Sequence, residues 1–238
     1  IDREHQMCYT VSQRQPHRKG KSQLQFSSEW SQGFSAQWPE CAQSRAPIRR
    51  TLHDMCAMFT DQDEVSRLAA GGQNPLIYEV SAWDAPSQSG ALSFGVTVLH
   101  PGQIDSEYYM TKGHYHVVRN TAEVYYTLSG EGVLVTENED GQCILLPMAP
   151  GTASYVAPGF AHRMVNTGSQ PLVSFYVFRA DAGHDYAAIE VGGFRCRIMA
   201  DEHGRPCVKH GNSLLPVCEL PCQEGHIDVT DLFREDSL

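Results

Sequence analysis

Three histidines and one glutamate are the side chains in this sequence best suited to bind a metal. His114 and His116 lie two residues apart, so in an extended segment both imidazoles project from one face. Glu123 follows after six further residues, and His162 ends the run PGFAH. Three imidazoles and one carboxylate, with coordination positions left open, suit Fe, Mn, Ni, Zn or Cu better than Ca or Mg. We therefore expect one divalent transition metal per chain, bound by His114, His116, Glu123 and His162.

The ligand types do not select the native metal, because affinity follows a general order and occupancy depends on supply. We expect iron, with manganese, nickel or zinc as alternatives. For an isolated His-x-His pair, the favoured interpretation would be ordinary core or surface histidines. Here an inward row of His, Glu and Tyr side chains would be costly without a cation, which favours the metal.

Short extended segments surround these residues. Leu92, Phe94, Val96 and Val98 alternate with smaller residues, as in a half-buried strand. Further strand-like runs cover 107–110, 123–128, 132–136, 143–147, 153–157 and 172–178. Glycines punctuate these runs, which indicates an all-β antiparallel sandwich or barrel. One short helix is expected over residues 61–71, from an acidic first turn to a glycine stop.

The alternation also predicts which side chains face inward. Glu123, Tyr125 and Thr127 share one face of their run. Thr97 points away from Val96 and Val98, so it can face the barrel interior together with the metal ligands.

Composition limits the classes of protein to consider. The chain has 238 residues, 41% of them hydrophobic, and a formal net charge of −10. We expect one principal domain with appendages and neither nucleic acid nor a membrane as a partner. No run approaches the roughly 18 uncharged apolar residues of a membrane span, and the polar start does not look like a secretory signal. Eight scattered cysteines favour reduced thiols and a cytoplasmic location over a disulfide framework.

We divide the chain into a polar arm over residues 1–45, a catalytic domain over 46–200 and an irregular C-terminal extension over 201–238. The arm lacks apolar periodicity, and its basic residues between 14 and 21 belong to no fold motif. We favour a solvated extension over an RNA-binding tail. The extension ends in an acidic stretch, 223–238, which we expect to be an exposed tail.

The spacing of the candidate ligands resembles the two motifs of the cupin fold. The first motif is His114-x-His116, six residues, Glu123, six residues and Gly130, and the second covers 158–166. More narrowly, the runs MTKGHYH, AEVY, MAPGT, AHRMVNTG and ADAGHDY resemble those of the cupin-type, metal-dependent glucose-6-phosphate isomerases. The resemblance covers about residues 48 to 200 and implies a jelly-roll barrel, a sugar-phosphate substrate and a role in glycolysis or gluconeogenesis. Cupin barrels often pair their outer sheets, so a homodimer is expected.

The same resemblance implies roles for individual residues. It matches His114, His116, Glu123 and His162 to the family's metal ligands. It matches Tyr78, Thr97, Thr111, Gly113 and Tyr125 to positions that hold the sugar phosphate, and His184 and Tyr186 to further active-site positions. The chain departs from the family at Phe178, where the family has a tyrosine before its Pro-Ala-Asp-Ala-Gly-His run.

The implied reaction moves hydrogen between C1 and C2 of an open-chain sugar. A divalent ion would act as a Lewis acid, and Glu123 is the candidate base. Tyr125 and Tyr186 are candidate donors to the sugar oxygens, and His184 could assist ring opening. The other interpretation of these three is that they orient ligands or pack in the barrel. Lys112 is the candidate cation for the phosphate.

Two other functions remain open from the sequence. The same four ligands serve metal-dependent dioxygenases and decarboxylases when the metal is redox-active. A non-catalytic sugar-binding cupin would bind without turnover, although such a binder does not need a cation with open coordination positions. Fold alone does not separate these functions.

Overall fold

The computed structural model describes residues 43–44 and 46–233. The arm predicted over residues 1–45 therefore lies almost entirely outside the described residues, as does the end of the predicted tail, 234–238. The division into arm, domain and extension stays a prediction.

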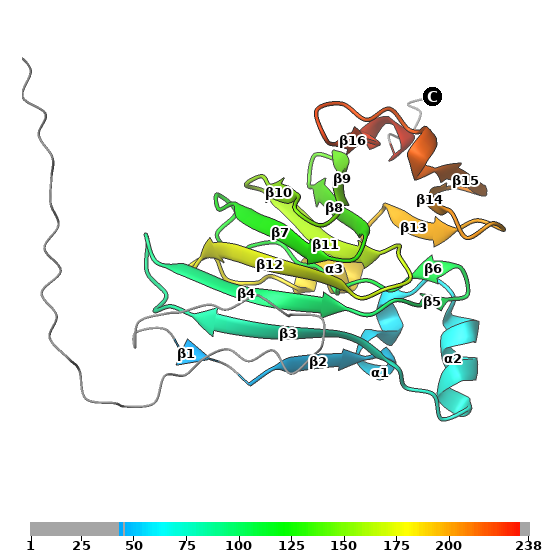
Figure 1. Cartoon of the computed structure of the whole chain (residues 1–238), viewed down its shortest axis with the longest axis horizontal. Coiled ribbons are helices and arrows are strands. Elements are labelled where there is room, and N and C mark those ends of the chain that lie inside the picture. Colours follow the sequence, from blue (N-terminus) through cyan, green and yellow to red (C-terminus); the bar gives the residue numbers. More distant parts are fainter. Residues whose placement is uncertain (1–42, 45, 234–238) are drawn as a thin grey trace, which may run out of the picture.

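Two antiparallel sheets form the body of the fold and enclose its core (Figure 1). The first sheet has the order β1 (Gln43–Ser44), β3 (Leu76–Asp84), β4 (Leu92–Leu99), β12 (Leu172–Arg179), β7 (Glu123–Ser129) and β10 (Ala153–Val156), with β2 (Ile48–Thr51) also paired to β3. The second has the order β11 (Phe160–Asn166), β8 (Gly132–Asn138), β9 (Cys143–Met148) and β16 (Ile227–Asp228). The all-β jelly-roll class expected from the sequence is confirmed.

A third antiparallel sheet and a few short helices complete the structure. The sheet has the order β15 (Ser213–Pro216), β14 (Pro206–His210), β13 (Arg197–Ala200), β6 (Glu107–Tyr108) and β5 (Gln103–Ile104). The α-helices are α1 (Leu52–Met55), α2 (Gln62–Ala70) and α3 (Ala187–Gly192), and 3-10 turns cover Cys56–Met58, Val217–Glu219 and Thr230–Phe233. None of the helices in the described part is long and apolar enough to cross a membrane.

Helix α2 forms where the sequence predicts a helix. The Asp61 carboxylate accepts a hydrogen bond from the Glu64 amide and caps the first turn. Gly71 ends the helix as its C-cap.

Strand β7 shows the predicted alternation. Glu123, Tyr125 and Thr127 are buried, whereas Val124 and Tyr126 are exposed. The strand thus delivers a carboxylate and a phenol to the interior from one face.

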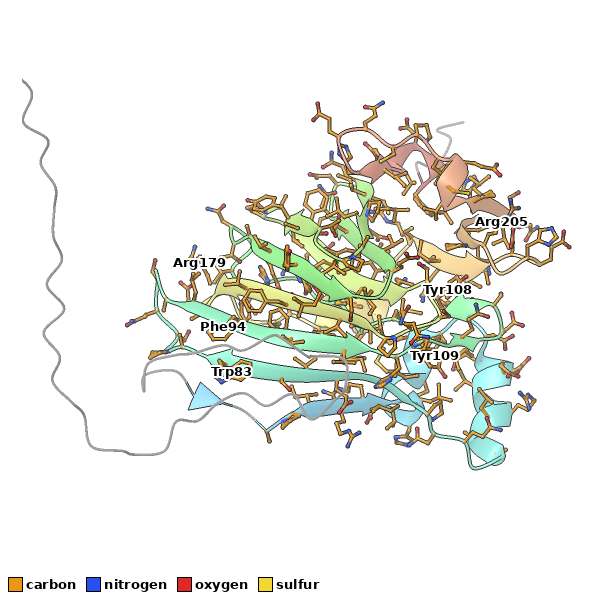
Figure 2. All side chains as sticks on the ribbon, in the orientation of Figure 1. Trp83, Phe94, Tyr108, Tyr109, Arg179 and Arg205 are labelled. Carbon is orange, nitrogen blue, oxygen red and sulfur yellow. The ribbon has the colours of Figure 1, made fainter. Side chains whose placement is uncertain are left out.

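On the same sheet, Trp83 of β3 stacks on Phe94 of β4, with ring centroids 5.3 Å apart (Figure 2).

The expectation of an exposed acidic tail is wrong for residues 227–233. Strand β16 pairs with β9, and Ile227 and Val229 are buried. The Thr230 hydroxyl accepts a hydrogen bond from the Cys143 amide at 3.0 Å. The acidic stretch packs against the barrel because Ile227 and Val229 are apolar and because the edge of β9 can form backbone hydrogen bonds with β16.

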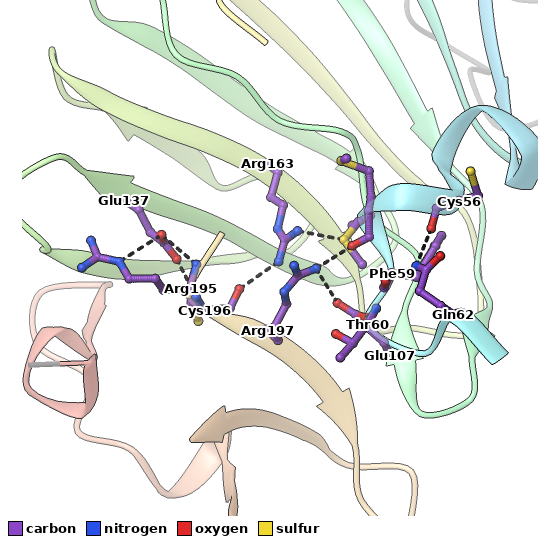
Figure 3. A network of polar contacts seen from close by, with 12 residues as sticks. Cys56, Phe59, Thr60, Gln62, Glu107, Glu137, Arg163, Arg195, Cys196 and Arg197 are labelled. Atoms are coloured by element: carbon purple, nitrogen blue, oxygen red, sulfur yellow. Dashed lines mark hydrogen bonds and ion pairs between the residues drawn. The ribbon is translucent and has the colours of Figure 1, made fainter. Parts of the chain in front are cut away.

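A buried polar network ties the segment after α3 to the barrel (Figure 3). Glu137 of β8 accepts a hydrogen bond from the Cys196 amide at 2.6 Å. Arg163 donates to the Cys196 carbonyl at 2.8 Å, and Arg197 contacts Glu107 at 3.1 Å. A buried polar group without a hydrogen-bond partner is costly, and these bonds supply partners. They therefore fix the segment around Cys196 against β8 and β11. The described cysteines are free, and Cys8 and Cys41 lie outside the described residues.

Candidate metal centre

The four predicted metal ligands meet inside the barrel. One potential ligand atom from each of His114, His116, Glu123 and His162 lies within 4.8 Å of all the others. Glu123 Oε2 is 3.0 Å from His116 Nε2 and 3.1 Å from His162 Nε2. His116, Glu123 and His162 are buried. These are the donor types and the separations that a transition-metal ion requires.

The backbone around His114 and His116 is not a regular strand. Residues 111–122 are irregular and contain isolated bridges, one of which pairs His114 with His162. The amide of each residue donates to the carbonyl of the other, at 3.3 and 3.1 Å. This pairing joins the two halves of the ligand set, which are far apart in the sequence.

In His116 and His162, the Nδ1 atom is occupied by a hydrogen bond. The Nε2 atom of each ring is therefore the one that faces the other predicted metal ligands. His116 Nδ1 lies 3.2 Å from the Thr121 carbonyl, and His162 Nδ1 lies 3.4 Å from the Phe160 carbonyl. A carbonyl only accepts, so each Nδ1 carries a proton. Nε2 of His114 and Nε2 of His162 are buried and make no hydrogen bond to the described residues. A cation at the centre would satisfy these nitrogens, so the residues fit a metal.

Electrostatics favour an ionised Glu123 and a neutral His114. Burial alone would raise the pKa of Glu123, but the close contacts of its carboxylate with the imidazoles of His162 and His116 outweigh burial and lower the pKa. Burial lowers the pKa of His114 well below its ordinary value, and the neighbouring His162 and His184 lower it further. An anionic carboxylate beside a neutral imidazole is the protonation pattern that metal binding needs.

Gly113 sets the direction of the chain just before His114. Its φ is +76°, a conformation that residues with a side chain rarely adopt. A Cβ at this position would lie 2.6 Å from the Phe194 ring and 2.9 Å from Arg163 Cβ. The glycine therefore lets the backbone pass close to the segment held by the buried network.

A small cavity of about 90 Å³ reaches three of the four predicted ligands, His114, Glu123 and His162. It is lined by most of the residues predicted for the site: Tyr78, Thr97, Thr111, Gly113, His114, Glu123, Tyr125, His162, His184 and Tyr186. The His184 ring lies 4.4 Å from the His114 ring, and both His184 and Tyr186 are exposed. Residues from β3, β4, β7, β11 and the segment before α3 therefore share one compartment.

Three cavity residues were missed from the sequence: Val80, Met164 and Tyr176. Tyr176 of β12 pairs with Tyr125 of β7, and their ring centroids are 5.9 Å apart. Paired residues on antiparallel strands project to the same face. The strand register would have identified Tyr176, but the sequence alone does not supply that register.

Lys112 does not line the cavity. Its ammonium group forms an ion pair with Glu190 of α3 and lies 5.1 Å from the centroid of the Tyr186 ring. Its charge is therefore already compensated by a carboxylate. Phe178, the position of the departure from the family, is buried between the His184 ring at 5.2 Å and the His116 ring at 6.1 Å.

Comparisons with known proteins identify the family. A family model described as glucose-6-phosphate isomerase (GPI) matches residues 49–213, which is more than half of the chain. The chain belongs to the glucose-6-phosphate isomerase family. Glucose-6-phosphate isomerases of Thermococcus gammatolerans and Pyrococcus horikoshii are 43% and 42% identical to it, covering 66% and 65% of this chain and 82% and 81% of theirs. The corresponding protein of Sinorhizobium medicae is 33% identical, covering 66% of this chain and 73% of its own.

Similar solved structures overlap this family member only in part. A Thermus thermophilus protein, TT1209, is 28% identical with a TM-score of 0.30, covering 39% of this chain and 75% of its own. Oxalate decarboxylase from Bacillus subtilis is 24% identical with a TM-score of 0.36, covering 45% of this chain and 26% of its own. Overlaps this partial carry no information about chemistry. The family match therefore decides for an isomerase over the dioxygenase, decarboxylase and non-catalytic alternatives.

Proposed function

We propose that the cavity over His114, His116, Glu123 and His162 is the active site at which this isomerase interconverts glucose 6-phosphate and fructose 6-phosphate. The activity follows from the family. The observation that supports this location is the convergence of four ligand atoms within 4.8 Å beneath a cavity lined by hydroxyl groups. The proposed metal is iron, with manganese, nickel or zinc as alternatives, and it would supply a Lewis acid for the sugar oxygens.

Glu123 is the proposed base for the proton that moves between C1 and C2. Its lowered pKa keeps the carboxylate ionised, and it lines the cavity. Tyr125 is a proposed donor to a sugar oxygen, because burial and the Glu123 charge raise its pKa well above the ordinary value and keep the hydroxyl protonated. The exposed His184 lies beside His114, where it can exchange protons with solvent during ring opening.

The phosphate group is proposed to lie at the end of the cavity formed by Tyr78, Thr97, Thr111 and the Gly113 amide. The Thr111 hydroxyl accepts a hydrogen bond from the Met164 amide at 3.0 Å, so its proton remains available to an anion. Cytoplasmic location and homodimer formation stay predictions.

A coupled assay of fructose 6-phosphate conversion tests this proposal. The purified protein is assayed as isolated, after chelation, and after re-addition of Fe, Mn, Ni or Zn. We expect chelation to abolish turnover and at least one metal to restore it, with unphosphorylated fructose a far poorer substrate. Turnover that survives complete metal removal would contradict the metal-dependent mechanism, and no turnover with any metal would contradict the activity.

The Thr97→Val variant tests the phosphate end of the site. Thr97 is buried on β4, and its hydroxyl makes no side-chain hydrogen bond to the described residues, so valine removes a donor at little cost to packing. We expect the KM for fructose 6-phosphate to rise roughly tenfold or more, from one lost charge-assisted hydrogen bond of about 1.5–3 kcal/mol. The kcat and metal content should change little. Thr97→Ser keeps the hydroxyl and should behave like the wild type, and an unchanged KM in Thr97→Val would remove Thr97 from the phosphate site.

The Phe178→Tyr variant tests the departure from the family. Restoring the hydroxyl beside His184 should raise kcat/KM about two- to tenfold, as expected for one neutral hydrogen bond of about 0.5–1.5 kcal/mol. Phe175→Tyr adds the same hydroxyl on the opposite face of β12 and should have no effect on steady-state kinetics. A lower kcat/KM in Phe178→Tyr, at unchanged metal content, would show that the phenylalanine suits this site better.

A further inference from the structure

A sugar phosphate brings close to two negative charges into this molecule at neutral pH, since the second pKa of a phosphate monoester is about 6. The chain itself has a formal net charge of −10. Hydroxyl groups alone do not offset the desolvation of a dianion, so the site requires a local cation. The question is which basic residue supplies it.

The cations nearest to the metal centre are already engaged. Lys112 is paired with Glu190, and Arg119 contacts Asp185 at 2.9 Å. Arg163 is buried behind Gly113, where its guanidinium lies 4.5 Å from the centroid of the Phe194 ring. None of these three side chains lines the cavity, and neither does Arg50, so the choice between them depends on which cation faces the Tyr78 end of the cavity without a carboxylate partner.

Arg50 occupies a different position, on the edge strand β2 next to β3 (Figure 1). It pairs with Tyr78, and directly opposed residues of antiparallel strands project to the same face of a sheet. Tyr78 lines the cavity, as does Val80 two residues further along β3. The register therefore places Arg50 on the cavity side of the sheet, at its solvent-exposed border.

Contacts at the Tyr78 hydroxyl agree with this placement. Burial raises the pKa of Tyr78 to about 12, and the guanidinium of Arg50 and the backbone of Lys112 both act in the opposite direction by hydrogen bonding. The Arg50 guanidinium and the backbone next to Gly113 thus approach one hydroxyl at the proposed phosphate end of the site. A phosphate bound there would find the Tyr78 hydroxyl, backbone amides and a guanidinium together.

Arg50 also has no ion-pair partner among the described residues. Asp54 is influenced by its charge, but the Asp54 carboxylate accepts hydrogen bonds from the Thr51 amide and hydroxyl, at 2.8 and 3.0 Å. The neighbouring Arg49 is different, since it contacts Glu79 at 3.2 Å on the other face of the same strand pair. The two adjacent arginines therefore point to opposite faces of the sheet, and only Arg49 forms an ion pair among the described residues.

We propose that Arg50 binds the phosphate group of the substrate and gives the site its preference for phosphorylated sugars. This inference rests on the proposed function. Arginine suits the role because its planar guanidinium can offer two parallel N–H donors to phosphate oxygens.

The test compares Arg50→Gln with Arg49→Gln, which removes the same charge one residue away on the opposite face. KM and kcat for fructose 6-phosphate are measured in the metal-loaded enzyme, together with competitive inhibition by inorganic phosphate. We expect Arg50→Gln to raise KM at least tenfold and to weaken phosphate inhibition by a similar factor, with kcat within about twofold of wild type. Arg49→Gln should change KM less than twofold. Arg50→Lys, which keeps the charge but loses the two-pronged geometry, should fall between Arg50→Gln and wild type.

Binding of fructose 6-phosphate to chelator-treated protein, measured by calorimetry, provides a readout independent of turnover. Arg50→Gln should weaken this binding, and Arg49→Gln should not. Equal effects of the two variants would show that Arg50 acts only through its long-range charge and does not bind the phosphate, which would overturn the proposal. A wild-type KM in Arg50→Gln would also overturn it. Either result, obtained beside an active wild type, leaves the isomerase function intact, whereas an inactive wild type would contradict that function itself.

Discussion

The His162→Ala variant is expected to lose its metal and, with it, at least about 10³-fold in isomerase activity, since a Lewis acid contributes several kcal/mol to such a transition state. His162 Nε2 is buried 3.1 Å from Glu123 Oε2, and a metal ion held by both side chains would account for this placement. Metal content per chain, measured by mass spectrometry after dialysis, and kcat from the coupled assay check this result.

Folding should survive the change. His162 pairs with His114 through backbone atoms, and alanine keeps those hydrogen bonds. The large apolar core does not depend on the imidazole, so thermal unfolding should shift by only a few degrees. His203→Ala, which removes an exposed imidazole from the segment between β13 and β14, serves as the control and should keep metal and activity. Wild-type metal occupancy in His162→Ala would refute the assignment of the site.

The Glu123→Gln variant is expected to lose about 10²-fold or more in kcat while retaining part of its metal. Glutamine keeps an oxygen near His116 and His162, where Glu123 Oε2 lies at 3.0 and 3.1 Å, but it cannot take up a proton. The kcat is compared at equal metal content, so that weaker binding is not mistaken for weaker catalysis. Glu123→Ala, which loses both functions, should lose the metal as well.

Glu137→Gln is a matched control, because Glu137 is a second buried glutamate on the neighbouring sheet. Its carboxylate accepts hydrogen bonds from the amides of Arg195 and Cys196, so the change should lower the melting temperature with little effect on kcat. A near-normal kcat in metal-loaded Glu123→Gln would reduce Glu123 to a ligand. The base would then lie elsewhere, with His184 the next candidate.

The convergence of His114, His116, Glu123 and His162 was predictable from the sequence, whereas the backbone that holds them was not. His114, His116 and Glu123 supply the donor atoms at a recognisable spacing, but residues 111–122 are irregular and no local pattern predicts their path. The bridge between His114 and His162 and the contacts of His116 Nδ1 with the Thr121 carbonyl and hydroxyl oxygens hold this segment. Such contacts join residues that no local pattern connects.

The sequence also did not predict the ion pair of Lys112 or the packing of the C-terminal stretch against the barrel. Lys112 looked like a phosphate cation, but its partner Glu190 lies on α3, 78 positions away. The acidic stretch after residue 223 looked solvated, yet β16 pairs with the edge of β9. In both cases the deciding partner comes from another part of the chain.

By itself, the sequence determined the all-β class, the helix at α2, the ligand types and the inward face of β7. These features follow from local rules: capping, side-chain alternation with a period of two, and the preferences of metals for donor atoms. Only the tertiary structure decided that Tyr176 lines the cavity, that Lys112 is paired, and that Arg50 stands opposite Tyr78. The physical reason is that strand register and distant partners are set by packing. A shift of one residue would turn Tyr176 or Arg50 to the other face of its sheet, and the pairing of Lys112 depends on where α3 packs.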